Sequence, residues 1–153
     1  MTRPDGPIVV GVSPNTGSPT ALRWAAEEAS LRSTKVRAVL AWRPLRAPAA
    51  PAGRPPATVV SVASTDYAAE AQETLRGFVA KALGSDEAVE CLAVRGNAVS
   101  ALLSAAHGAQ LIVVGEPRAG RVAAVRASLV APLLLAQAEC PVVVMPGAFF
   151  GSS

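Results

Sequence analysis

The sequence predicts an α/β protein built on a five-stranded parallel sheet. Two continuous apolar runs, 7–12 and 111–115, are typical of central strands that are buried on both faces. Segments with helical spacing alternate with the apolar runs along the chain, which favours parallel strands joined by right-handed crossovers. The length of 153 residues suits one domain, 1–153, in which folding should bury about 68–70% of the unfolded surface.

The first half of the chain begins with the strand at 7–12. Turn residues follow, and Ser18 before Pro19 predicts the cap and first position of a helix, where the missing N–H of proline costs nothing. Within 19–32 the apolar residues share one face and the charged residues another, so this helix should pack on the sheet. The second predicted strand is 36–42.

A Pro- and Ala-rich loop is predicted over 43–63. Closely spaced prolines from Pro44 to Pro56 exclude a central strand or a regular helix there. Because structureless connections longer than about 12–15 residues are uncommon, we expect this loop either to be mobile or to cover a site. Helical spacing resumes over 65–83, and Gly84 ends that helix.

The second half of the chain repeats the alternation of strands and helices. Its predicted elements, in order, are a strand at 88–94, a turn at 95–97, a short helix over 99–106, a strand at 111–115, a helix over much of 121–138 and a strand at 141–146. In such sheets ligands lie beyond the carboxyl ends of the strands, where the strand order reverses. Candidate site residues should therefore follow the first, second and fourth strands.

Composition excludes several classes of protein. Hydrophobic residues make up 51% of the chain and charged residues 16%, which excludes intrinsic disorder, and no apolar run approaches the roughly 18 residues of a membrane span. The 14 basic residues are scattered among few aromatic rings, so no nucleic acid partner is expected. The apolar start is too short for a secretion signal, which predicts a cytoplasmic protein.

Catalytic and metal-binding motifs are missing from the sequence. Neither GxGxxG nor a GxxxxGK[ST] phosphate loop occurs, which disfavours a flavin or nicotinamide oxidoreductase. The single histidine, His107, is expected only to favour the helix dipole at a helix end. Cys91 and Cys140 lack metal-ligand spacing and are predicted to be buried thiols. We expect no metal, no catalytic residue and no enzymatic activity.

Several segments resemble the universal stress protein family. Residues 8–12 and 21–29 resemble the opening of these proteins, 95–98 resembles a conserved turn, and 111–115 with 140–144 resembles their close. Only the Pro-rich loop has no clear counterpart. The resemblance implies a Rossmann-like sheet of strand order 3-2-1-4-5 with helices on both faces. It also implies a stress-response or regulatory role.

Many members of that family bind ATP through a Gly-x2-Gly-x9-Gly-Ser/Thr pattern after the fourth strand. In this chain Gly115 is retained, but Arg118 stands at the second glycine, Ser128 at the third and Leu129 at the hydroxyl position. A side chain at Arg118 occupies space that the family leaves for phosphate, and Leu129 removes a hydroxyl donor. The phosphate cradle is therefore expected to be weakened.

The opposite wall of the implied site also departs from the family. Ser13 stands where the first strand usually ends in an aspartate that holds the nucleotide, and Pro14 follows where glycine is common. Ala41, near the end of the second predicted strand, is the candidate from that strand. We therefore expect a vestigial nucleotide site with no cofactor, at which ATP binds weakly or not at all.

The alternative is a nucleotide-binding sensor. Arg118, Arg121 and Arg126 would supply side-chain charge in place of the glycine cradle, because the planar guanidinium grips phosphate well. Gly115 and Gly120 do not restore the motif, since isolated glycines are ordinary at turns.

The last predicted strand indicates a homodimer. Val142–Met145 carry no charge, and an uncharged apolar edge promotes aggregation unless it is paired or covered. In universal stress proteins this strand commonly pairs with its copy across a two-fold axis, and the resemblance implies the same pairing here. Phe149 and Phe150 could dock across the partner. A covered edge within a monomer is the alternative.

Overall fold

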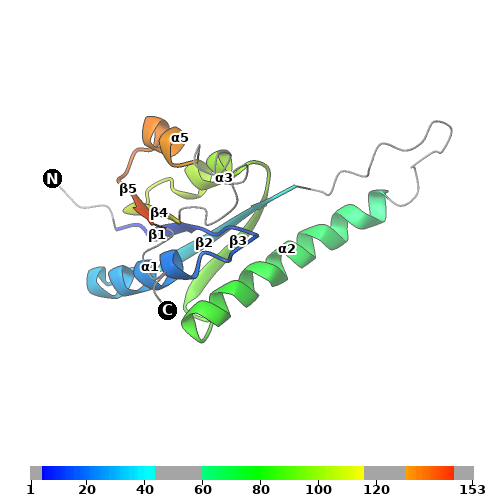
Figure 1. The fold of residues 1–153 in the computed structure, drawn as a ribbon, viewed down its shortest axis with the longest axis horizontal. Helices are drawn as coiled ribbons and strands as arrows, with labels where there is room; N and C mark the ends of the chain where they lie inside the picture. The colour runs from blue at the N-terminus through cyan, green and yellow to red at the C-terminus, as the bar shows by residue number, and fades with distance from the viewer. Residues whose placement is uncertain (1–4, 44–59, 116–129, 147–153) are drawn as a thin grey trace.

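The computed structural model of the chain describes residues 5–43, 60–115 and 130–146 (Figure 1). Its strands are β1 Ile8–Gly11, β2 Val36–Trp42, β3 Val89–Arg95, β4 Leu111–Gly115 and β5 Val142–Met145. Its helices are α1 Pro19–Arg32, α2 Val60–Leu83, α3 Ala98–Ala105 and α5 Val130–Gln137. None of the helices in this described part combines the length and hydropathy that a membrane span requires.

All five strands form one parallel sheet in the order β3-β2-β1-β4-β5, which confirms the predicted order. β1 lies at the centre, with Ile8 opposite Val36 of β2 and opposite Leu111 of β4. β3 and β5 form the two edges of the sheet. The sheet therefore presents one edge that follows α2 in the chain and another that follows α5.

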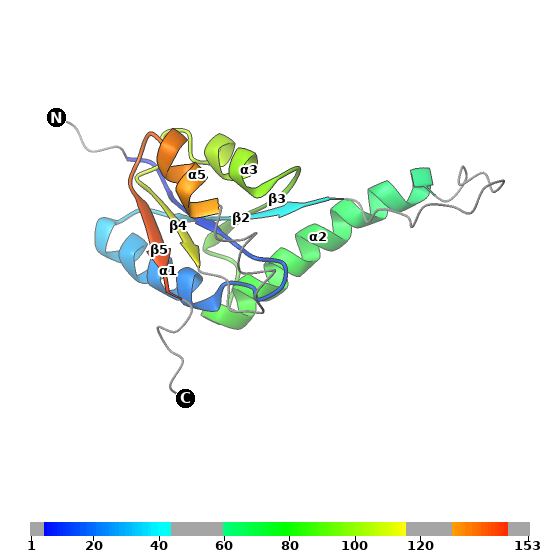
Figure 2. The same cartoon turned by 45° about the horizontal axis from the view of Figure 1, so that its top comes forward.

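Helices cover both faces of the sheet, as predicted (Figure 2). Ile8 and Val10 pack in one core with Leu22 of α1 and Leu75 of α2, whereas Val9 belongs to the core beneath α3 and α5. These three β1 residues have no exposed surface. Burying an aliphatic side chain of this size stabilises the fold by about 1.5–3 kcal/mol, so β1 contributes to both cores.

Two predicted boundaries in the middle of the chain are wrong. α2 begins at Val60, so the end of the loop predicted over 43–63 is helical, because residues 57–63 contain no proline or glycine that would prevent it. β3 ends at Arg95, one residue later than predicted, because Arg95 pairs in register with Trp42. The remainder of that loop and 121–129 of the last predicted helix lie outside the described residues.

Candidate functional site

A cavity of about 240 Å³ lies at the carboxyl ends of β1, β2 and β4. It forms at the point where the sheet order reverses, because the chain crosses one face after β1 and the other face before β4. Four predicted site residues line it together: Ser13, Pro14, Ala41 and Gly115. The other four, Arg118, Gly120, Ser128 and Leu129, lie outside the described residues.

Further walls of the cavity were not identified from the sequence. Leu102 and Ala98 of α3, Val39 of β2, Val114 of β4 and Val130 of α5 also line it. The sequence signal that could have located the α3 residues was the turn after β3, because it also lies at the carboxyl end of a strand. These residues add apolar surface and give the cavity its hydrophobic lining.

The connection from β1 to α1 is closed by its own hydrogen bonds. The Ser13 carbonyl accepts from the Gly17 N–H at 2.8 Å, and the Ser13 Oγ accepts from the Asn15 N–H at 3.2 Å. The Ser13 N–H donates to the Ser18 Oγ at 2.9 Å, and the Ser18 N–H donates to the Thr16 Oγ1 at 3.1 Å. Several backbone donors of this loop are therefore already used within the chain.

The prediction that Ser18 caps α1 is wrong in its hydrogen bonding. Ser18 does occupy the N-cap position before Pro19, but it adopts left-handed φ 46° and ψ 51°, and its side chain makes no capping bond. The same Oγ instead accepts from Ser13, across the loop. A left-handed conformation of a residue other than glycine costs on the order of 1–3 kcal/mol, which the buried loop contacts must offset.

Gly17 fixes this loop against α2. It adopts φ 76°, and a Cβ at this position would collide with the ring of Phe78. Only glycine combines that backbone conformation with so close an approach to an aromatic side chain. The loop after β1, which forms one wall of the cavity, is therefore positioned by its close contact with Phe78 of α2.

The backbone of Ala41 faces the cavity. The Val39 carbonyl accepts from the Val12 N–H at 2.8 Å, so by the alternation of a parallel strand Ala41 points to the same side. β1 pairing ends at Gly11 opposite Val39. Within the described residues the structure shows no hydrogen bond to the Ala41 N–H or carbonyl on this side. Ala41 thus presents one donor and one acceptor next to each other.

The described walls of the cavity carry no charged side chain. Positive charge lies beside it, in an adjoining hollow of about 600 Å³ that shares Ala98 and Val130 and is lined by the exposed Arg43. The Asn97 Oδ1 in this hollow accepts from the Ser100 N–H at 2.8 Å and caps α3. One donor at the amino end of α3 is therefore satisfied by the chain itself.

The remaining reactive side chains lie away from the cavity. His107 is exposed just beyond the Ala106 C-cap of α3. Cys91 and Cys140 are free and half-buried rather than fully buried, because Cys91 lies on an edge strand and Cys140 in the loop before β5. Burial raises the pKa of both thiols. No cluster of three metal-ligating side chains occurs in the described ranges.

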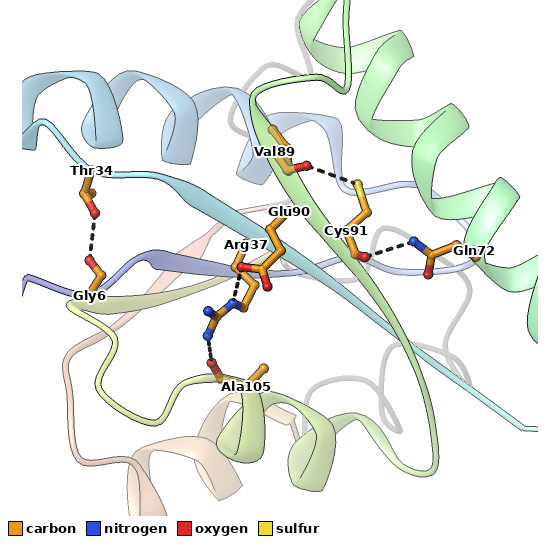
Figure 3. Close-up of polar contacts among 8 residues, drawn as sticks. All are labelled: Gly6, Thr34, Arg37, Gln72, Val89, Glu90, Cys91 and Ala105. Atoms are coloured by element: carbon orange, nitrogen blue, oxygen red, sulfur yellow. Dashed lines mark hydrogen bonds and ion pairs between the residues drawn. The ribbon is translucent and has the colours of Figure 1, made fainter.

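A larger hollow of about 880 Å³ lies at the amino ends of β2 and β3. Two of its polar side chains are engaged in the fold (Figure 3): the Thr34 Oγ1 donates to the Gly6 carbonyl at 2.8 Å, and Glu90 pairs with Arg37 at 2.8 Å. Arg37 also donates to the Ala105 carbonyl at 2.8 Å. These groups hold the sheet together, so the smaller cavity at the carboxyl ends is the better candidate site.

Known proteins are similar to this chain over most of its length. The model of the Universal stress protein family matches residues 6–146. A universal stress protein of Mycolicibacterium smegmatis is 33% identical over 149 residues, which cover 92% of this chain and 48% of that relative. The chain therefore spans about half the length of this curated relative.

Solved structures share the fold. A universal stress protein from Archaeoglobus fulgidus in complex with dAMP is 27% identical, with a TM-score of 0.54 and coverage of 91% of this chain and 96% of that one. A universal stress protein in complex with cAMP has a TM-score of 0.59 at 17% identity, covering 93% and 98%. With the family model matched across nearly all of its sequence, the chain belongs to the universal stress protein family.

Proposed function

We propose that this universal stress protein is a cytoplasmic, non-enzymatic regulatory homodimer that binds ATP weakly or not at all. The observation that carries the proposal is the chemistry of the cavity at the carboxyl ends of β1, β2 and β4. Its described walls are apolar and uncharged, and the polar groups of Ser13 are bonded within the loop. A triphosphate needs charged or free N–H partners, because burying unpaired charge is costly.

The size of the cavity supports the same proposal. Its volume of about 240 Å³ lies below the ~300–1,000 Å³ that is usual for small-molecule sites. Pro14 lines the cavity and has no N–H to offer a phosphate. The described part of the site therefore suits a small, uncharged group better than a complete nucleotide.

One observation favours the second candidate, a nucleotide-binding sensor. The donor and acceptor of Ala41 face the cavity side by side, and such a pair matches the hydrogen-bonding edge of a nucleobase. Two similar structures are named as complexes with dAMP and cAMP. In this alternative Arg118, Arg121 and Arg126 hold the phosphates.

A thermal shift series separates the two functions. A ligand at about 100 times its dissociation constant adds roughly 2.7 kcal/mol to the free energy of unfolding. We expect millimolar ATP, ADP, AMP and cAMP each to leave the unfolding midpoint nearly unchanged. A large shift with ATP contradicts the proposal. In that case Arg118→Ala distinguishes an arginine that holds phosphate, whose loss weakens binding, from one that obstructs it, whose loss strengthens binding.

The proposed homodimer rests on the β5 edge. The Ile112 N–H donates to the Pro141 carbonyl at 3.0 Å, which fixes the alternation of the backbone groups along β5. The backbone polar groups of Pro141, Val143 and Met145 therefore point toward β4, whereas those of Val142 and Val144 point away from it. No described residue hydrogen-bonds the outward backbone groups of Val142 or Val144, and the Val144 residue is 37% exposed. Antiparallel pairing of two copies would satisfy these groups. Phe149 and Phe150 lie outside the described residues.

Light scattering after size-exclusion chromatography tests the dimer. We expect a mass of twice 15.5 kDa at micromolar concentration. A mass of one chain at all accessible concentrations would contradict edge pairing and leave the covered edge of a monomer as the correct alternative.

A further inference from the structure

The β3 edge of the sheet has its own set of outward backbone groups. The Gly96 N–H donates to the Trp42 carbonyl at 2.9 Å, which fixes the alternation along β3. Val89, Cys91, Ala93 and Arg95 therefore direct their N–H and carbonyl groups away from β2. An edge of this kind is a template for pairing with a strand of another chain.

A glutamine side chain occupies the middle of this edge. Gln72 projects from α2 toward β3 (Figure 3), and its Nε2 donates to the Cys91 carbonyl at 2.9 Å. Its Oε1 accepts from the Ala93 N–H at 3.1 Å. The amide of Gln72 thus bonds the same acceptor and the next donor that one residue of an added parallel strand would use through its own N–H and carbonyl.

The groups before this position are also engaged. The Val89 N–H donates to the Asp86 carbonyl at 3.2 Å, and the Cys91 thiol lies 3.8 Å from the Val89 carbonyl as a weak donor. Together with the Gln72 amide, these contacts follow one another along the edge from Val89 to Ala93. None of them is a backbone hydrogen bond from a neighbouring strand.

We propose that Gln72 caps the β3 edge and so confines strand pairing between copies of this chain to the β5 edge. The proposal rests on the proposed homodimer, because it explains why association stops there. Two self-pairing edges on one sheet would join copies alternately through β3 and β5 into an open chain, whereas a single self-pairing edge closes as a two-fold dimer.

The experiment is the mass of Gln72→Ala by light scattering across a concentration series. We expect assemblies larger than a dimer that grow with concentration, while the wild type stays at one mass. Gln72→Ala that folds, as shown by circular dichroism, and keeps the wild-type mass overturns the cap. Where Gln72→Ala does not fold, Gln72→Leu, which retains a long side chain over the sheet but no hydrogen-bonding group, is judged by the same criterion.

A second substitution checks that the new contact uses β3. The N–H of Ala93 points outward, so proline is tolerated there by the β2–β3 ladder but cannot donate to an added strand. We expect Gln72→Ala with Ala93→Pro to return to the wild-type mass. Persistent large assemblies in this double variant overturn the proposal, because they form through another surface.

The cap and the β5 dimer can fail separately. Val144→Pro removes an outward N–H from β5 and should give a monomer if the proposed homodimer is correct. In that background Gln72→Ala should restore a dimer, now through β3. A wild type that is already monomeric refutes the β5 dimer alone, and Gln72→Ala still tests the cap by whether it creates a self-associating species.

Discussion

The two edges of the sheet differ in what occupies their outward backbone groups. On β3, the Gln72 side chain bonds Cys91 and Ala93. On β5, the outward groups of Val142 and Val144 have no partner among the described residues. Both edges belong to the same parallel sheet and obey the same alternation. The comparison teaches that the availability of an edge depends on which side chains reach it from the helical layer, besides its own sequence.

The largest expected effect on self-association comes from a substitution in β5, the edge whose outward backbone groups have no partner among the described residues. Val144→Pro should weaken self-association by about 100-fold or more, roughly 2.7 kcal/mol, because it removes a donor from each copy. Sedimentation equilibrium or light scattering over a dilution series measures this. Arg95→Pro is the matched control, since its N–H also faces outward but on β3, and it should leave the association unchanged. Equal weakening by both prolines would contradict the difference between the edges.

The next largest effect is on stability and comes from removing the Gln72 amide from the β3 edge. Gln72→Ala should lower the free energy of unfolding by about 1–3 kcal/mol, because each of its two lost hydrogen bonds is worth about 0.5–1.5 kcal/mol. Urea unfolding followed by circular dichroism measures the change. Glu73→Ala, at the exposed neighbouring position of α2, should change stability by less than about 0.5 kcal/mol. Indistinguishable changes in the two variants would show that the two hydrogen bonds of Gln72 contribute no net stability.

A smaller effect on stability tests whether the charge of Glu90 or the amide of Gln72 keeps a second strand away from β3. Glu90→Gln removes the ion pair with Arg37, which joins partners whose side chains are 50% and 25% exposed. An ion pair this exposed contributes at most about 1 kcal/mol. We therefore expect a small loss of stability and an unchanged mass. Large assemblies of Glu90→Gln would mean that the β3 charge, and not Gln72, excludes a second strand.

The smallest effect is the pH dependence of stability that arises from the Cys91 thiol on the β3 edge. Burial raises the pKa of Cys91, Asp86 raises it further, and Arg76 lowers it. The folded state therefore releases the thiol proton at higher pH than the unfolded state. Its contribution to stability is complete below the unfolded pKa of about 8.5 and is lost as pH rises through the folded pKa.

Alkylation by iodoacetamide measures this shift. In a Cys140→Ala background, which removes the other thiol whose pKa is raised, the alkylation rate of Cys91 in a pH series should reach half its maximum at a higher pH in the folded protein than in urea. The same midpoint pH in the two states would contradict the raised pKa.

Much of the fold could be predicted because its signals are local. The runs at β1 and β4 consist of Ile, Val and Leu up to a final glycine, which suits strands buried on both faces, and Pro19 and Gly84 mark helix ends through their own backbone preferences. The start of α2 at Val60 was missed because residues 60–64 show only weak helical periodicity in the sequence. The four site residues Ser13, Pro14, Ala41 and Gly115 were found because they lie at or just beyond the carboxyl ends of strands that a parallel sheet brings together.

The sequence by itself determined the alternation of five strands with helices, the apolar centre of the sheet and the uncharged chemistry of the Ser13–Pro14 wall. Only the tertiary structure decided that Ser18 bonds Ser13 instead of capping α1, and that Gln72 reaches an edge strand 19 and 21 residues further along the chain. The physical reason is range. Burial patterns and turn preferences act over a few residues, whereas these hydrogen bonds depend on where α1 and α2 settle when Leu22, Leu75 and Val79 pack against the sheet.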